Sequence, residues 1–147
     1  MLETTINEVL TKDTVTNKIF LGVFARDELP LKVKYPSCLI FNTAPRINKG
    51  EHWLALHYNE KGFCNFFDSY GKDPSKFLIT DYIEKTSTDW NYNKKRIQGS
   101  MPYCGHYCVF YLLFKAYFSF SRNALVFYWF ANRTVFRNRH CLGTRLF

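Results

Sequence analysis

The sequence predicts an α+β domain in which a mixed β-sheet packs against a buried helix. Residues 37–43 contain four consecutive apolar residues, 38–41, and are typical of a buried strand. Two aromatic-rich runs, residues 52–58 and 63–68, are separated by an Asn/Gly turn and predict a β-hairpin. Residues 103–118 are apolar on every side except at Lys115, as in a central helix. At 147 residues the chain fits one such domain and is short for two.

The composition favours a folded protein of a reducing, intracellular compartment. Hydrophobic residues make up 47% of the chain and aromatic residues 19%, which supports a packed core and argues against disorder. The five cysteines are odd in number and scattered, unlike a secreted disulfide framework. The N-terminus shows no secretion signal, and polar residues interrupt the apolar stretch 107–131 before it is long enough to span a bilayer. We therefore expect neither secretion nor membrane insertion.

The chain is basic, with 20 Lys and Arg against 12 Asp and Glu and a net charge of +8. Such an excess favours a polyanionic partner such as DNA, or it serves solubility alone. The basic residues are spread over several groups, among them 94–96 and 133–145, and no base-reading motif accompanies them. Any contact with nucleic acid would therefore be made to phosphates and would be indifferent to sequence.

A short amphipathic helix is predicted near the N-terminus. Thr5 and Glu8 have the spacing of a capping box. Apolar residues recur there at helical spacing, namely Ile6, Val9 and Leu10. Residues 20–24 form a further apolar run, which precedes a charged, proline-containing loop.

Further elements are predicted after the hairpin. Residues 77–85 are typical of a surface helix, with Pro74 allowed in its first turn. Residues 94–98 predict a short strand that leads into the loop before the long helix. Polar residues after Phe118 are expected to end that helix, and 124–135 to form another apolar element.

Cys104 stands at the predicted start of the long helix. Unpaired backbone N–H groups and the positive end of the helix dipole favour a thiolate there, as a cysteine nucleophile requires. The same N–H groups, including that of Gly105, could hold a developing oxyanion. Alternatively, Cys104 could be a packing residue, or it could pair with Cys108, one turn on, in a metal site. Only His140 and Cys141 offer a second ligand pair, so we assign no metal and interpret Cys108 as core.

The predicted hairpin brings His52 and Asp68 together at its open end. With 59–61 as the loop, Tyr58 faces Gly62 and His52 faces Asp68, and a four-residue loop shifts this register by one. Directly opposed Cβ atoms lie about 4.5–5.5 Å apart, so imidazole and carboxylate would meet. Singly, His52 could be an edge histidine and Asp68 a turn-capping residue. Together with a helix-start cysteine they would supply base, orienting acid and nucleophile.

Two other polar residues lie near this set. His57 points to the face of a regular strand opposite His52, so it is left out of the site. Gln98 lies six residues before Cys104 and is uninformative by itself. Its side-chain amide could nevertheless donate a hydrogen bond to an oxyanion alongside backbone N–H groups.

Several motifs carry a resemblance to a known family. They are Gly50-Glu-His-Trp-Leu-Ala55, Phe66-Phe-Asp-Ser-Tyr-Gly71 and Gln98-Gly-Ser-Met-Pro-Tyr-Cys-Gly-His-Tyr-Cys-Val-Phe110, with Phe20-Leu-Gly22 and Leu39-Ile-Phe-Asn-Thr-Ala44 before them. Together they resemble the adenovirus-type cysteine endopeptidase (adenain) family and its relatives in Maverick/Polinton elements and large-virus satellites. The likeness runs from about residue 20 to 118. The order His, acid, Gln, Cys resembles the wider clan of ubiquitin-like-protein proteases and is reversed from papain, in which the Cys precedes the His.

The resemblance implies an adenain-like fold and a role for each residue of the set. It implies that His52 is the general base, Asp68 its orienting acid, Gln98 an oxyanion donor and Cys104 the nucleophile. Trp53 would be the aromatic residue that packs beside the histidine. It also implies DNA as an activator, since the adenoviral enzyme uses DNA as a cofactor.

The chain departs from the family pattern in two places. The activating peptide of the adenoviral enzyme is disulfide-linked to a Cys between the acid and the Gln, and no residue from Asn65 to Tyr103 is Cys here. A covalently linked peptide cofactor is therefore not expected. The segment after about residue 121 does not match the longer C-terminal part of the family and is interpreted as divergent or truncated.

We therefore predict a cysteine endopeptidase that needs no metal and processes viral or transposon-encoded structural proteins, in the host nucleus or the virion. One alternative is an isopeptidase that acts on ubiquitin-like modifiers. Another is a catalytically idle, basic module that binds nucleic acid or capsid. The four-residue set favours an enzyme, because a binding module has no reason to keep it.

Overall fold

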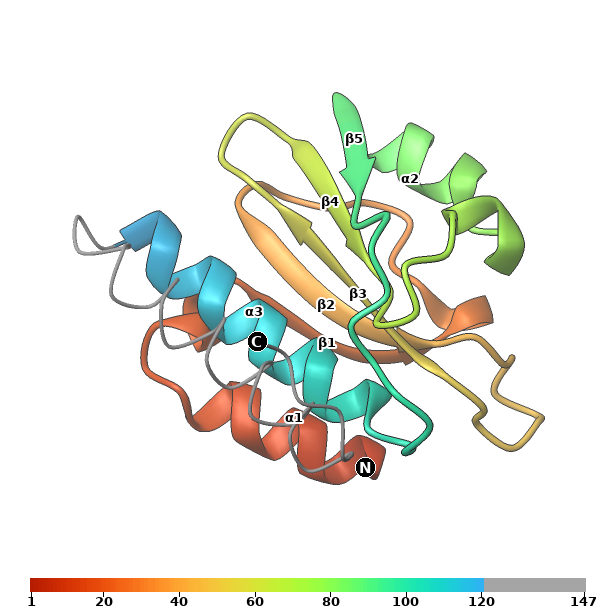
Figure 1. The fold of residues 1–147 in the computed structure, drawn as a ribbon. Helices are drawn as coiled ribbons and strands as arrows, with labels where there is room; N and C mark the ends of the chain where they lie inside the picture. The colour runs from red at the N-terminus through yellow and green to blue at the C-terminus, as the bar shows by residue number, and fades with distance from the viewer. Residues whose placement is uncertain (121–147) are drawn as a thin grey trace, which may run out of the picture.

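The computed structural model describes residues 1–120, and Figure 1 shows how they are arranged. The helices and strands follow in the order α1 (Glu3–Lys12), β1 (Phe20–Ala25), β2 (Ser37–Asn42), β3 (Trp53–Tyr58), β4 (Phe63–Phe67), α2 (Thr80–Thr86), β5 (Asp89–Tyr92) and α3 (Cys104–Phe120). Short 3-10 helices lie between them: η1 (Thr16–Lys18), η2 (Arg26–Glu28) and η3 (Pro74–Phe77).

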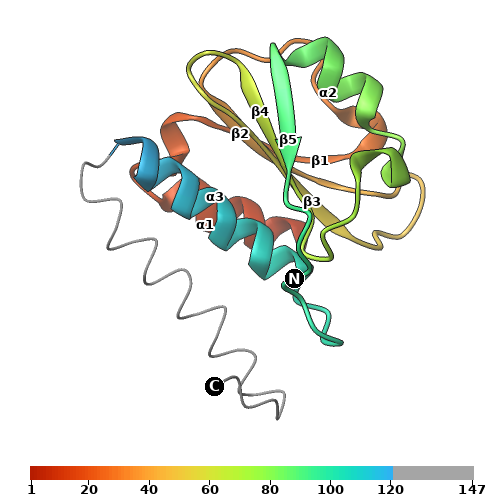
Figure 2. The ribbon, with the colours of Figure 1, turned by 45° about the horizontal axis from the view of Figure 1, so that its top comes forward.

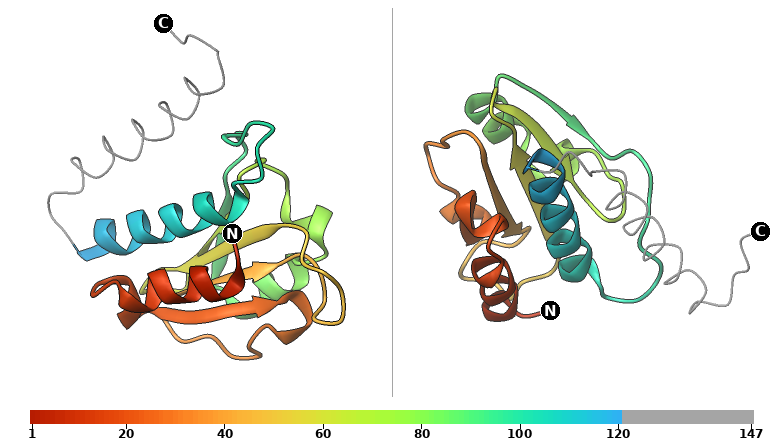
Figure 3. Two further views of the ribbon diagram at one scale, coloured as in Figure 1. Left: turned by 90° about the horizontal axis from the view of Figure 1, so that it is seen from below. Right: turned by 90° about the vertical axis from the view of Figure 1, so that its left-hand side faces the viewer.

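The strands form one mixed sheet in the order β1-β2-β3-β4-β5. β2, β3 and β4 are antiparallel, whereas β1 pairs with β2 and β5 with β4 in parallel. Helices α1 and α3 lie side by side against one face of the sheet, and α2 lies against the other (Figures 2 and 3). The predicted α+β class, with a mixed sheet packed on a buried helix, is confirmed at this level.

Each face of the sheet carries its own apolar cluster, because side chains alternate along each strand. In β3, Ala55 belongs to the cluster beneath α1 and α3. Leu54, Leu56 and Tyr58 belong to the cluster that α2 covers. Leu56 has no exposed surface, so its truncation to alanine would cost about 2–5 kcal/mol of stability.

Helix α1 begins earlier than the sequence indicated. Its N-cap is Leu2, which makes no side-chain capping bond, so the capping box predicted at Thr5 is wrong. Thr5 already lies inside the helix. Ile6 and Leu10 are fully buried, whereas Val9 is 39% exposed and lies outside the core.

Two predictions for the segment after the hairpin are wrong. The helix expected at 77–85 is divided at Leu78, which has a left-handed backbone with φ of 55°, into η3 and α2. The strand expected at 94–98 is not formed by those residues. The segment just before them, Asp89–Tyr92, forms β5 at an edge of the sheet. Residues 94–98 form no strand, because the backbone N–H groups of Ile97 and Gln98 both donate to the Ser69 carbonyl, each at 3.0 Å.

The long helix starts at Cys104, one residue later than predicted, and continues beyond Phe118 to Phe120. The break expected directly after Phe118 is therefore not found there. The apolar element predicted at 124–135 lies outside the described residues. Among residues 1–120, no helix is both long and apolar enough to cross a bilayer.

Candidate active site

The hairpin of β3 and β4 sets the positions of His52 and Asp68. Its register differs from the prediction by two residues, because Tyr58 pairs with Cys64 and not with Gly62. The Asn59 side chain accepts hydrogen bonds from two backbone N–H groups of the turn, at 2.9 and 3.0 Å, and closes it. A shift of two residues leaves each side chain on its predicted face. His52 and Asp68 therefore stay on one face as diagonal neighbours.

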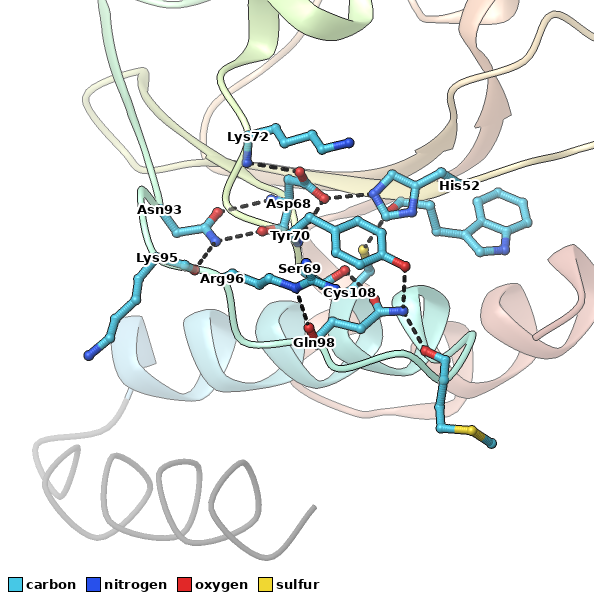
Figure 4. Close-up of polar contacts among 12 residues, drawn as sticks. His52, Asp68, Ser69, Tyr70, Lys72, Asn93, Lys95, Arg96, Gln98 and Cys108 are labelled. Carbon is cyan, nitrogen blue, oxygen red and sulfur yellow. Dashed lines mark hydrogen bonds and ion pairs between the residues drawn. The ribbon is translucent and has the colours of Figure 1, made fainter. Parts of the chain in front are cut away.

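His52 and Asp68 are in direct contact just outside the paired strands. His52 Nε2 lies 2.6 Å from Asp68 Oδ1. Figure 4 draws this contact as a dashed line. Asp68 has no exposed surface. It also accepts hydrogen bonds from the backbone N–H groups of Tyr70 at 3.1 Å and Lys72 at 3.0 Å. Asp68 thus caps a turn and contacts the imidazole at the same time.

Asn93 supports this acid, although nothing in the sequence singled it out. Its side-chain oxygen accepts from the Asp68 backbone N–H at 2.9 Å, and its amide donates to the Asp68 carbonyl at 2.6 Å. The loop after β5 therefore holds the end of β4 in place. Such a paired amide contact has no local sequence signature, because the two residues are distant in the chain.

Cys104, the first residue of α3, is 9% exposed and lies beside His52. Burial opposes the charged form of His52, but hydrogen bonds to Asp68 and Cys104 outweigh it and raise the His52 pKa to about 9. Burial also opposes the Cys104 thiolate. The His52 hydrogen bond and the backbone N–H groups of Trp53 and Gly105 outweigh that effect and lower the thiol pKa. The arrangement favours a thiolate beside an imidazolium.

The carboxylate completes this electrostatic pattern. Burial would raise the Asp68 pKa, but the hydrogen bonds from His52 and from the backbone N–H groups of Tyr70 and Lys72 outweigh it and lower the pKa. Asp68 is therefore ionised at neutral pH. A charged acceptor at 2.6 Å from Nε2 leaves the other ring nitrogen, Nδ1, to serve the thiol.

The other described cysteines lie in a different environment. Burial raises the pKa of both Cys38 and Cys64 to about 12. Cys108 has no exposed surface, and its thiol donates to the Trp53 carbonyl at 3.3 Å. Burial raises its pKa well above the ordinary value, and it lies in the core beneath α3, as predicted. Within residues 1–120 no three His, Cys, Asp or Glu side chains converge to hold a metal ion.

Gln98 lies close to this set and is almost fully buried, with 3% exposure. Its side-chain oxygen accepts from Ser69 Oγ at 2.5 Å. Its side-chain nitrogen donates to the Met101 carbonyl at 2.6 Å and to the Tyr70 hydroxyl at 3.2 Å. Both amide protons are therefore engaged, so an oxyanion would have to replace one of these partners. The oxyanion role stays a prediction.

Trp53 and Gly105 pack against each other. A Cβ on Gly105 would lie 3.1 Å from Trp53 Cδ1 and 3.0 Å from Met1 Cβ, so a glycine allows this close approach. The Trp53 indole N–H donates to the Met1 carbonyl at 3.1 Å. The rings beside His52 are those of Tyr70 and Phe77, with centroids 5.1 and 5.9 Å away. Neither ring was predicted to contact His52.

Two pockets meet at Cys104. One, which we call the His52 pocket, has a volume of about 390 Å³, and its lining includes His52, Tyr70 and Gln98. The other, which we call the Arg46 pocket, has a volume of about 360 Å³ and lies between the N-terminus and the loop 43–52. Cys104 and Pro102 line both. A chain that passes over the thiol would thus find a hollow on either side.

Comparison with known proteins relates part of this chain to a viral protease. A segment of 56 residues is 43% identical to the protease of human adenovirus A serotype 12. The match covers 37% of this chain and 24% of that protein, so the chain spans about a quarter of the length of the adenovirus protease it matches. No protein-family model matches the sequence. The chain is thus similar to an adenovirus protease over a limited segment.

Proposed function

We propose that this chain is a cysteine endopeptidase in which Cys104 is the nucleophile, His52 the general base and Asp68 the orienting acid. One observation carries the proposal: the buried Asp68 carboxylate contacts His52, and His52 in turn contacts a thiol of lowered pKa at the start of α3. Packing alone does not require such a set at the junction of two pockets. The similarity to an adenovirus protease supports the same reaction class.

The proposed reaction begins with the Cys104 thiolate, whose sulfur forms a bond to the carbonyl carbon of a peptide. The carbonyl electron pair moves onto oxygen, and the imidazolium of His52 gives its proton to the leaving amine as the C–N bond breaks. A water then loses a proton to His52 and attacks the thioester carbon, and the C–S bond breaks to release the carboxylic acid and restore the Cys104 thiolate beside the imidazolium. Asp68 stabilises the imidazolium and fixes the ring orientation throughout.

The developing oxyanion needs hydrogen-bond donors close to the Cys104 thiol. The backbone N–H groups at the start of α3 are free of helical partners and supply the positive end of the helix dipole. Gln98 would add its side-chain amide once the substrate oxygen replaces the Met101 carbonyl as a partner. The proposed substrates are viral or transposon-encoded structural proteins, whose extended segments would cross Cys104 between the two pockets.

Cleavage of a proteome-derived peptide library, read by mass spectrometry, tests this function. The parent chain is expected to produce defined cleavages, and Cys104→Ala to reduce them by at least roughly 1,000-fold, because the attacking sulfur is lost. Cys108→Ala, one turn along α3, is the matched control and should keep the cleavages. Equal cleavage by Cys104→Ala, or none by the folded parent, would reject the proposal. Cleavage confined to isopeptide-linked conjugates would favour the isopeptidase instead.

A further inference from the structure

We infer that Tyr70 is a positioning residue that fixes the Gln98 amide relative to the His52 imidazole. The inference rests on the proposed function, since it concerns how the proposed catalytic groups are held. Tyr70 follows Asp68 by two residues in the turn after β4, so one short turn carries both side chains.

Tyr70 touches three of the four candidate residues. Its backbone N–H donates to Asp68 Oδ1, the oxygen that also contacts His52 Nε2. Its ring lies 5.1 Å from the His52 ring, with the planes tilted by 33°. Its hydroxyl accepts from Gln98 Nε2 at 3.2 Å. Figure 4 shows the ring next to the imidazole with its hydroxyl directed at the Gln98 amide.

Two cations lie near the Tyr70 ring. The Arg96 guanidinium lies 4.9 Å from the ring centroid and the Lys72 ammonium 5.6 Å. Arg96 also donates to the Gln98 carbonyl at 2.8 Å, so the loop that carries Gln98 is tied to the same ring. A ring restrained in this way can hold a partner at a fixed place.

These contacts assign different tasks to the partners of the Gln98 amide. Ser69 Oγ holds the amide oxygen, and the Tyr70 hydroxyl holds one amide proton. The Met101 carbonyl, in the exposed loop before α3, takes the other proton. It is therefore the partner that a substrate oxygen would replace. Tyr70 would keep the amide plane fixed during this exchange.

Tyr70→Phe tests the inference, because it removes the hydroxyl and keeps the ring and the backbone contact. Its kcat should fall about 3- to 10-fold, the range for one neutral hydrogen bond, with KM within twofold. The alkaline limb of the pH profile of kcat/KM should not move, because His52 keeps its contacts with Asp68 and Cys104. In a Gln98→Ala background the same change should have no further effect, because the hydroxyl acts through the amide. Tyr103→Phe, in the neighbouring loop, is the matched control.

All rates are normalised to active-site titration with a thiol-directed peptide warhead, so a loss of folded protein is not read as a loss of kcat. A parental kcat in Tyr70→Phe, or losses that multiply in the double variant, would overturn the role of Tyr70 and leave the proposed function standing. A parent that neither cleaves peptides nor reacts at Cys104 would instead defeat the proposed function, and this inference with it.

A separate observation concerns the substrate: the two pockets beside Cys104 differ in charge. Apart from His52 and Cys104, whose opposite charges offset each other, the His52 pocket is lined by three cationic side chains and one carboxylate, namely Arg26, Lys72, Lys76 and Glu51. The Arg46 pocket is lined by two cationic side chains, Arg46 and Lys49, and by two carboxylates, Glu3 and Glu51. Arg46 is moreover paired with Glu3 and Glu28. We infer that the substrate carries an acidic side chain at the position that enters the His52 pocket.

Pairs of peptides that differ only by Glu or Gln, placed in turn at each position around the scissile bond, test this preference. At one position the Glu peptide should have a kcat/KM about 3- to 10-fold higher at low salt, and the advantage should shrink as salt screens it. The Lys72→Gln/Lys76→Gln double variant should lose the advantage, whereas Lys85→Gln, an exposed lysine on α2, should keep it. A ratio within twofold at every position, or one unchanged in the double variant, would overturn the preference while cleavage itself continues.

Discussion

Asp68→Asn keeps the shape of the side chain and removes the charge that His52 contacts. The rise of the His52 pKa from 6.5 to about 9 corresponds to ~3 kcal/mol in favour of the imidazolium. Asp68 and Cys104 both contribute to it. If Asp68 supplies about half, its loss should move the alkaline limb of kcat/KM down by roughly one pH unit. We also expect kcat/KM at the optimum to fall roughly 10- to 100-fold, because the ring loses its charged anchor.

The assay is peptide hydrolysis from pH 5 to 10, with unfolding by denaturant measured in parallel. In Asp68→Asn the new amide would face the Lys72 N–H that now donates to Oδ2, so a stability loss of about 1–3 kcal/mol is expected. Asp73→Asn is the matched control, because Asp73 caps η3 through the Ser75 N–H and does not contact His52. An alkaline limb that stays near pH 9, together with kcat/KM within twofold of the parent, would refute the reasoning.

Three further predictions concern Gln98, His57 and the net charge. Gln98→Ala should lower kcat by roughly 10- to 1,000-fold with little change in KM, and steady-state kinetics checks this split. Burial and the Lys115 charge lower the pKa of His57 from 6.5 to about 4, so between these values the unfolded state binds a proton that the folded state does not. Stability should therefore fall as pH drops from 6.5 to 4, by up to about 3 kcal/mol, and denaturation of His57→Leu should show a flatter dependence. A random DNA duplex should bind with log K falling about 0.9 per neutralised phosphate against log salt, and absence of binding at low salt would discard that partner.

The sequence located the candidate site because the signals for it are local. A cysteine at the start of an apolar helix, and a His and an Asp at the open end of a hairpin, can be recognised from spacing alone. The two-residue error in register did not matter, because strand alternation preserves the face of His52 and Asp68 under an even shift. His57 likewise stayed on the opposite face, where neither of its ring nitrogens has a hydrogen-bond partner among the described residues.

Features that depend on distant contacts were missed. β5 is only four residues long, and although its aromatic residues alternate with polar ones, so short an edge strand forms because it pairs with β4, which lies far back in the chain. Tyr70 and Asn93 carry no signal of their own. Their importance comes from contacts with His52, Gln98 and the Asp68 backbone that only the folded chain creates. Leu78 interrupts the predicted surface helix through a left-handed backbone that its residue type does not favour.

Reaction with a thiol-directed peptide warhead, followed by mass mapping of the adduct, tests the central claim most directly. Cys104 has a lowered pKa and borders both pockets, whereas burial raises the pKa of Cys38, Cys64 and Cys108. The account predicts a single early adduct on Cys104, formed at neutral pH and slowed in Asp68→Asn. An adduct that forms first on another cysteine, or a Cys104 that reacts no faster than a free peptide thiol, would contradict it.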